Sequence, residues 1–242
     1  MLLRWLAFLT ILLVTPTSSR AQTLTSHQQI AFDIYKELVE INTVTATGDT
    51  ERAAQAMAAR LRAAGFTGSD VHVLSPAPRK GNLVARLRGT EKRKPIVLLA
   101  YTDVVDARPE DWSLDPFKLT ERDGYFYGRG TTDNKFMATA FVANLIRYKQ
   151  EGYTPERDII VALEADEEIG DAYGLGIRWL LANHRPLIDA STLNRVLADD
   201  GISITQSGDR CLAHRLPYTA RSWQRSRGSQ PSSGLASLSF PP

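Results

Sequence analysis

Acidic residues follow several apolar stretches of this sequence, at points where a strand would end. The acids concerned are Asp103, Asp133, Glu167, Glu168 and Asp199. Carboxylates that gather at one edge of a sheet repel one another unless a cation neutralises them. Zinc accepts carboxylate ligands, and two zinc ions can share one bridging carboxylate and one bridging water. The pattern therefore predicts a metal site with Asp133, Glu168 and Asp199 as ligands.

The stretch Gly124–Lys135 places Asp133 between a glycine-rich turn and a helix. It contains a short aromatic strand and a Gly-Arg-Gly turn, and a helical apolar pattern follows over 136–149. Glycine lets the backbone approach its neighbours closely, so this acid can point into a cleft instead of lying on a helix flank. A phosphate-binding loop is an alternative for the same turn, but it would need a glycine directly before the lysine.

Strands and helices must position these acids. The continuous apolar runs Ile96–Ala100 and Asp158–Ala165 predict strands buried on both faces. Shorter strands are expected over Val71–Leu74, Asn82–Leu87 and Arg195–Ala198. Helices are expected over Ser26–Ile41 with Ser26 as its cap, Glu51–Ala64, Phe136–Lys149 and Gly174–Asn183. This alternation predicts an α/β protein, a three-layer α/β/α sandwich with ligands at the carboxyl ends of the strands.

The composition of the 242-residue chain is that of a globular protein. Apolar residues make up 43% and charged residues 23%, and the length is sufficient for one domain with a sizeable core. The net charge of +2 does not indicate a polyanionic partner. Cys211 is the only cysteine, which excludes an intrachain disulfide and a cysteine-based zinc site.

The first 21 residues have the layout of a secretory signal peptide. Arg4 gives a positive start, Trp5–Val14 is apolar, and Ser19–Ala21 suits cleavage before Gln22. The apolar run is too short for a comfortable membrane span. An uncleaved anchor is the alternative. We expect an exported protein, periplasmic or secreted, with no membrane association after cleavage.

The last segment of the chain differs in composition. From Arg210 to Pro242 there are five arginines and no Asp or Glu, and Ser, Pro and Gly are frequent. This composition predicts a disordered basic tail over 207–242. A nucleic-acid-binding arm is the alternative, but no such motif is present in the sequence, so we expect no nucleic-acid partner.

Four segments together resemble the dinuclear zinc peptidase family that includes aminoacylase, carnosinase, succinyl-diaminopimelate desuccinylase and bacterial glutamate carboxypeptidase. They are Val97–Val105, Asp111–Phe117, Tyr127–Lys135 and Ala165–Gly170, within a similarity that runs from about Ile30 to Gly201. The resemblance implies the N-terminal part of a zinc-exopeptidase-like catalytic domain at 22–206. It further implies a truncated domain whose lid or dimerisation domain is absent, through a truncation or a shifted reading frame. We therefore expect no homodimer of the family type.

The resemblance also implies a role for each acid. Asp133 would bridge two zinc ions, Glu168 would bind one of them, and Asp199, or its neighbour Asp200, would bind the other. Glu167 would be the general base that takes a proton from the attacking water. Asp103 would orient a metal-binding histidine two residues earlier. The resemblance further implies a cis peptide bond after Asp133.

The sequence departs from the family at its histidines. Tyr101 replaces the expected metal-binding histidine, and none of the four histidines of the chain matches the second one. A phenol has a pKa near 10 and is a poor zinc ligand at neutral pH. Two carboxylates per metal would remain, which suits weak binding of harder cations better than tight zinc binding.

These observations favour a metallohydrolase, a metallopeptidase or carboxypeptidase type of enzyme that cleaves an amide or peptide bond of a small peptide or N-acyl amino acid. The alternative is a catalytically impaired fragment or pseudoenzyme with the same fold, because the ligand histidines are missing. The substrate itself is not encoded in any of the motifs.

Overall fold

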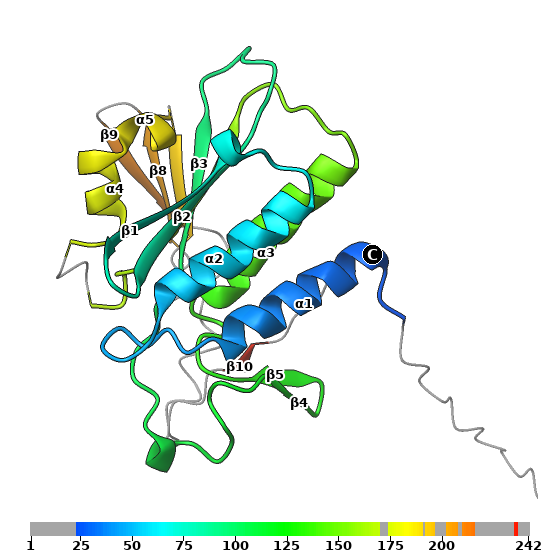
Figure 1. The fold of residues 1–242 in the computed structure, drawn as a ribbon, viewed down its shortest axis with the longest axis vertical. Helices are drawn as coiled ribbons and strands as arrows, with labels where there is room; N and C mark the ends of the chain where they lie inside the picture. Colours follow the sequence, from blue (N-terminus) through cyan, green and yellow to red (C-terminus); the bar gives the residue numbers. More distant parts are fainter. Residues whose placement is uncertain are drawn as a thin grey trace, which may run out of the picture.

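A sheet of seven strands forms the middle layer of the protein (Figure 1). The computed structural model describes residues 23–169 and 174–190 with their side chains, and the backbone of 192–196, 202–207, 210–215 and 235–236. The strands of the large sheet are β1 (Val71–Ala77), β2 (Lys80–Leu87), β3 (Ile96–Tyr101), β6 (Ile159–Glu164), β7 (Thr192–Val196), β8 (Ile202–Ser207) and β9 (Arg210–Arg215). A second, small sheet contains β4 (Thr120–Arg122), β5 (Tyr125–Tyr127) and β10 (Leu235–Ala236).

The order of the strands in the large sheet is β1-β2-β6-β3-β7-β8-β9. Strand β3 is parallel to both of its neighbours, β6 and β7, whereas the other neighbouring pairs are antiparallel. The register of β3 with β6 places Tyr101 level with Glu164. Parallel strands end at the same edge of a sheet, so the residues that follow β3 and β6 meet there.

Helices cover both faces of the sheet. They are α1 (Ser26–Glu40), α2 (Thr50–Ala63), α3 (Lys135–Gln150), α4 (Ile177–Asn183) and α5 (Arg185–Ile188), with two short 3-10 turns at Gly68–Asp70 and Pro109–Asp111. The first three helices lie on one face and the last two on the other (Figure 1). The predicted three-layer α/β/α arrangement is therefore confirmed.

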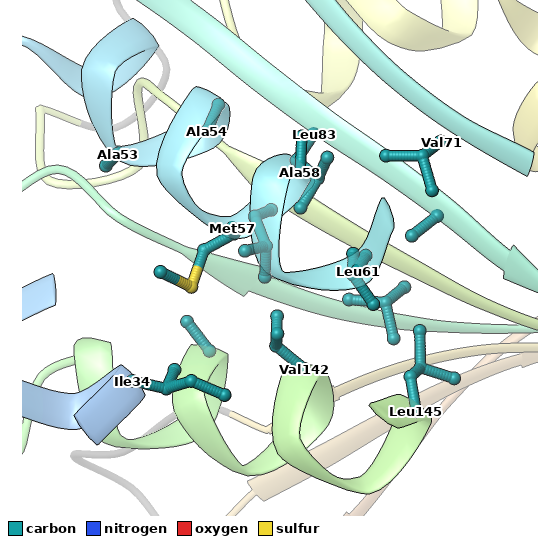
Figure 2. Close-up of a cluster of buried hydrophobic side chains, with 14 of the residues drawn as sticks. Ile34, Ala53, Ala54, Met57, Ala58, Leu61, Val71, Leu83, Val142 and Leu145 are labelled. Atoms are coloured by element: carbon teal, nitrogen blue, oxygen red, sulfur yellow. The ribbon is translucent and has the colours of Figure 1, made fainter. Parts of the chain in front are cut away.

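Alternate residues of the central strands enter two different cores. On β2, Leu83 and Ala85 face the larger core between the sheet and α1–α3, whereas Val84 faces the smaller core beneath α4 and α5. Figure 2 shows the larger core, where Met57 and Leu61 of α2 meet Val142 and Leu145 of α3. This alternation explains why the central strands are continuous apolar runs in the sequence.

The boundaries of the helices follow local chemistry. Thr25, and not Ser26 as predicted, caps α1, because Thr25 and Gln28 form a capping box in which each side chain accepts the other's backbone N–H. Asp49 caps α2, and Gly65 after its end has a φ of +93°, as expected for a glycine that closes a helix.

Some segments differ from their predicted extent. Strand β1 continues through Pro76 to Ala77, which its position at the edge of the sheet permits because a proline there breaks no ladder. Strand β7 begins three residues before the predicted range Arg195–Ala198 and ends within it, at Val196. Strands β9 and β10 lie within the segment for which the sequence predicts disorder. The predicted signal peptide lies outside the described residues, and no helix in the described part is long and apolar enough to span a membrane.

Candidate active site

Tyr101 is the last residue of β3 and lies beside the candidate bridging acid. Its side chain is buried, and its hydroxyl donates a hydrogen bond to Oδ1 of Asp133. Burial, this hydrogen bond and the neighbouring carboxylates raise the pKa of Tyr101 far above its usual value. The phenol therefore keeps its proton at neutral pH, where it is a hydrogen-bond donor to Asp133.

Asp103 is fully buried two residues after the end of β3. Its Oδ2 accepts a hydrogen bond from the backbone N–H of Glu168 at 3.0 Å, and the hydroxyl of Thr45 lies 3.5 Å away. Burial raises the pKa of Asp103, while the backbone donors of Glu168 and Glu167 partly offset this. Its Oδ1 is buried and has no hydrogen-bond partner within the described residues. This atom is the acceptor that a histidine at position 101 would use under the family resemblance.

The glycine-rich turn before Asp133 packs tightly against the segment after β3 that contains Asp103 and Val104. Gly130 has a φ of +82°, and a Cβ on it would lie 2.8 Å from Cγ1 of Val104. The backbone carbonyl of Thr131 accepts a hydrogen bond of 3.0 Å from Tyr35 of α1. The Asp133–Asn134 peptide bond is cis, as the resemblance implies.

Lys135 is a buried cation at the start of α3. Its Nζ donates a 2.8 Å hydrogen bond to the carbonyl of Ile41, which follows α1. Burial lowers the pKa of Lys135 to about 7, and the negative charge of Asp103 partly opposes this shift. This lysine therefore joins α1, α3 and the acidic cluster in one place.

Glu167 and Glu168 follow β6 and are both half-buried. Burial, then the nearby charges of Asp133, Asp103 and Glu167, raise the pKa of Glu168 to about 8. The guanidinium of Arg129 acts in the opposite direction. A carboxylate that is destabilised by several like charges gains most from a bound cation.

Arg129 is held next to this cluster by two contacts. Its Nη2 donates a 3.0 Å hydrogen bond to the backbone carbonyl of Asp106, and its guanidinium stacks over the ring of Trp112 at 5.1 Å. Burial lowers the pKa of Arg129, while Glu168 and Asp106 oppose the shift. The arginine therefore acts on Glu168 through its nearby positive charge.

The described residues fit part of a metal centre. Asp133 and Glu168 would supply two oxygen ligands, and the raised pKa of Glu168 favours a nearby cation. Within the part of the chain that the structure describes, however, no group of three or more His, Cys, Asp or Glu side chains is arranged to hold a metal ion. Asp199 and Asp200 lie outside the described residues.

The structure brings five of the six predicted site residues together. Hydrogen bonds link Tyr101 to Asp133 and Asp103 to Glu168, and electrostatic interactions link Glu167 to Glu168 and Tyr101. The sixth, Asp199, is not described. The metal-binding and catalytic roles of these residues are predictions.

Three buried polar residues that support the site were not predicted. Glu164 lies within β6, where its Oε2 accepts the backbone N–H of Ile177 at 2.8 Å and so holds the start of α4. The side chain of Asn82 accepts from the backbone of Ala165 and donates to that of Leu175. Glu164 stands inside an apolar run, so the sequence indicates a polar residue that needs a buried partner. The same reasoning applies to Lys135, which precedes an apolar helix.

Three comparisons with known proteins agree on the type of domain. Residues 97–209 match the family described as Peptidase family M20/M25/M40. The chain is 44% identical over 80 residues to the N-fatty-acyl-amino acid synthase/hydrolase of Xenopus tropicalis, covering 33% of this chain and 16% of that protein. It is 36% identical over 133 residues to succinyl-diaminopimelate desuccinylase of Delftia acidovorans, covering 54% of this chain and 33% of that protein.

The fold is also similar to that of solved structures. The crystal structure of human carnosine dipeptidase 1 superposes with a TM-score of 0.54 at 24% identity, covering 66% of this chain and 36% of that one. This likeness concerns the fold. The chain spans about a third or less of the length of these relatives, so the matches concern one part of a larger architecture.

Proposed function

We propose that the protein is a metal-dependent hydrolase of amide or peptide bonds, from the premise that residues 97–209 match peptidase family M20/M25/M40. The observation that carries the proposal is the cluster of Asp133, Glu167 and Glu168 at one edge of the sheet, where burial, and then the charges of the neighbouring carboxylates, raise the pKa of Glu168 to about 8. Such a cluster is stabilised by a divalent cation.

We propose zinc as the metal, with Asp133, Glu168 and Asp199 as its ligands and Asp200 as the alternative to Asp199. When bound, a divalent cation polarises the substrate carbonyl and makes water a better nucleophile. The chain's own residues then do the proton transfer. Glu167 takes a proton from the attacking water and delivers it to the amine nitrogen that leaves. Asp103 accepts a hydrogen bond from the backbone N–H of Glu168 and so links the residues after β3 to those after β6.

Small peptides or N-acyl amino acids are the proposed substrates, since relatives include a desuccinylase, an aminoacylase and a dipeptidase. Export to the periplasm or the medium, with cleavage before Gln22, is part of the proposal and rests on the sequence pattern alone. The impaired form of the family remains the alternative because of Tyr101, but the relatives are hydrolases and do not favour it.

Hydrolysis assays on the full chain test the function. With Zn²⁺, Co²⁺ or Mn²⁺ added, the protein should release the amino acid from an N-acyl amino acid or a dipeptide, and a chelator should stop the reaction. Glu167→Gln should lower the turnover by at least about a hundredfold. Glu110→Gln, which changes an exposed glutamate in a neighbouring loop, is the matched control. No metal-dependent turnover with any of these ions, or equal rates for the two variants, would refute the proposal.

A further inference from the structure

A cavity of about 390 Å³ opens beside the acidic cluster. Its lining residues are Thr45, Ala46, Val104, Val105, Asp106 and Ile169. Most of them are apolar, and two large hydrophobic residues keep much of their surface exposed, Val105 at 44% and Ile169 at 36%. The volume lies within the range of about 300–1,000 Å³ that is typical of small-molecule sites.

The cavity adjoins the candidate active site, because residues next to the site residues in the chain line it. Val104 directly follows Asp103, and Ile169 directly follows Glu168. Thr45 contacts both a cavity residue and a site residue. Its backbone N–H donates to the carbonyl of Val104 at 3.2 Å, and its hydroxyl lies 3.5 Å from Oδ2 of Asp103. A group bound in the cavity therefore lies next to the residues proposed for the chemistry.

The wall of the cavity is fixed by backbone contacts between distant segments. Val44 and Val104 form a parallel bridge, and the backbone N–H of Val104 donates to the carbonyl of Thr43 at 3.2 Å. The hydroxyl of Thr43 donates to the carbonyl of Thr102 at 2.6 Å. A preformed wall of this kind binds a ligand without the cost of ordering a loop.

The charge in the described part of the cavity lining is negative. Among the described residues that line the cavity, Asp106 alone is charged. Its backbone carbonyl is held by Arg129, which fixes the position of the residue. A carboxylate on the group that enters would be repelled by Asp106, whereas an uncharged aliphatic group would gain from contact with Val105 and Ile169.

We propose that this cavity is the subsite that binds an uncharged aliphatic group of the substrate, the acyl chain or side chain next to the amide that is cleaved. The proposal rests on the proposed hydrolase function and adds the chemical class of the group recognised. It predicts a preference for aliphatic N-acyl amino acids over those with a dicarboxylic acyl group.

Calorimetric binding of a homologous series tests the subsite without turnover. The probes are N-acetyl-, N-butanoyl-, N-hexanoyl- and N-octanoyl-L-alanine, measured with the full chain carrying Glu167→Gln in the presence of Zn²⁺. Affinity should rise by about twofold to fourfold for each added methylene. N-succinyl-L-alanine should bind more weakly than the butanoyl compound, and Asp106→Asn should narrow this difference.

Two variants from different segments and one control complete the experiment. Val105→Asp and Ile169→Ser should each remove the dependence on chain length. Leu181→Asp should keep it, because Leu181 is equally exposed, at 45%, but lies on α4 outside the cavity lining. An affinity that is independent of chain length in the unsubstituted cavity, or a dependence that survives both substitutions, would overturn the subsite. Absence of hydrolysis with retained chain-length dependence would instead contradict only the proposed function.

Discussion

At the scale of single residues, the hydrogen bond from Tyr101 to Asp133 determines which carboxylate oxygens of the site are available to a cation. The hydroxyl of Tyr101 donates a hydrogen bond to Asp133, so a carboxylate oxygen that could bind a cation is already occupied. Asp103, two residues later, has the opposite condition, because its buried Oδ1 lacks a partner within the described residues. A histidine at position 101 would change both, because it would free the oxygen of Asp133 and could donate a hydrogen bond to Asp103.

Tyr101→His should therefore tighten metal binding. An imidazole can donate one N–H to Asp103 and present its other nitrogen to a cation, and it releases Oδ1 of Asp133. The expected gain in Zn²⁺ affinity is about tenfold or more, measured by calorimetry on the full chain.

Tyr101→Phe is the control for this prediction, because it removes the hydrogen bond to Asp133 without adding a ligand. It should change the affinity much less than the histidine. Equal affinities for the histidine and phenylalanine variants would show that position 101 does not contribute a ligand.

The raised pKa of Glu168 predicts how stability depends on pH in the metal-free protein. The folded state binds its proton more tightly than the unfolded state, whose glutamate titrates near 4.5, so folding is favoured below that pH and the advantage is lost as the pH rises toward about 8. Asp103 acts in the same direction. Lys135, whose pKa is lowered from 10.5 to about 7, costs stability in full below about pH 7, and this cost fades only as the pH rises above that value.

The melting temperature in the presence of a chelator should thus fall between pH 5 and pH 7. Glu168→Gln should reduce this slope because it removes the titrating group, and Glu156→Gln, at an exposed glutamate, should leave the slope unchanged. A melting temperature that rises over this interval in the unsubstituted protein would contradict the assignment.

At the scale of elements, the turn between β5 and α3 sets the position of Asp133. Gly130 takes a left-handed conformation and lies against Val104, and the same turn is held by Tyr35 of α1 through Thr131. The turn thus connects α1, the β3 strand end and α3. A side chain at Gly130 would disturb all three contacts.

Gly130→Ala should destabilise the protein by more than the ~1–2 kcal/mol that a left-handed conformation costs an L-residue. The added Cβ would lie 2.8 Å from Cγ1 of Val104 and 3.0 Å from Cδ of Lys135. Gly152→Ala is the matched control, because Gly152 has a φ of +67° and no atom within 4 Å of its ideal Cβ position. Urea unfolding measures both, and equal losses would show that packing at Gly130 contributes nothing.

The sequence predicted the elements that have a long apolar run or a sustained helical spacing of apolar residues. The apolar strands β3 and β6, the helix α3 and the acids at the strand ends follow from periodicity and from what carboxylates require. The extension of β1 through Pro76 and the hydrogen bond from Lys135 to Ile41 do not follow from the sequence, because each depends on the arrangement of segments that are distant in the chain. The cap at Thr25 was missed for a local reason, because Ser26 beside it is an equally suitable capping residue. Asp133 could be placed in a loop from its sequence, but its contact with Tyr101 needed the fold.

At the scale of the whole molecule, the two faces of the sheet are unequal. Among the described residues, the core under α1–α3 contains twenty buried residues, and the core under α4 and α5 contains seven. The helices on the weaker face are also short, at seven and four residues. Burial supplies most of the free energy that keeps a helix folded, so the two faces should differ in local stability.

Hydrogen exchange should reveal this difference. Amides of α3 and β6 should exchange last, at rates set by global unfolding, whereas those of α4 and α5 should exchange through local opening at least about tenfold faster. Leu145→Ala should accelerate exchange throughout the protein, and Leu180→Ala should accelerate it mainly in α4 and α5. Equal protection of α3 and α4 would contradict the inferred asymmetry.

The long-range hydrogen bonds around the site impose an order on its assembly during synthesis. Tyr35 bonds to Thr131 across 96 residues, and Lys135 bonds to Ile41 across 94. The first helix is therefore made long before the turn and the lysine that it must contact. A nascent chain that has not yet exposed residue 135 can form α1, α2 and the β1–β2 hairpin, but not the acidic cluster. Closing such long loops costs entropy that only the completed contacts offset, so the site assembles among the last parts of this region.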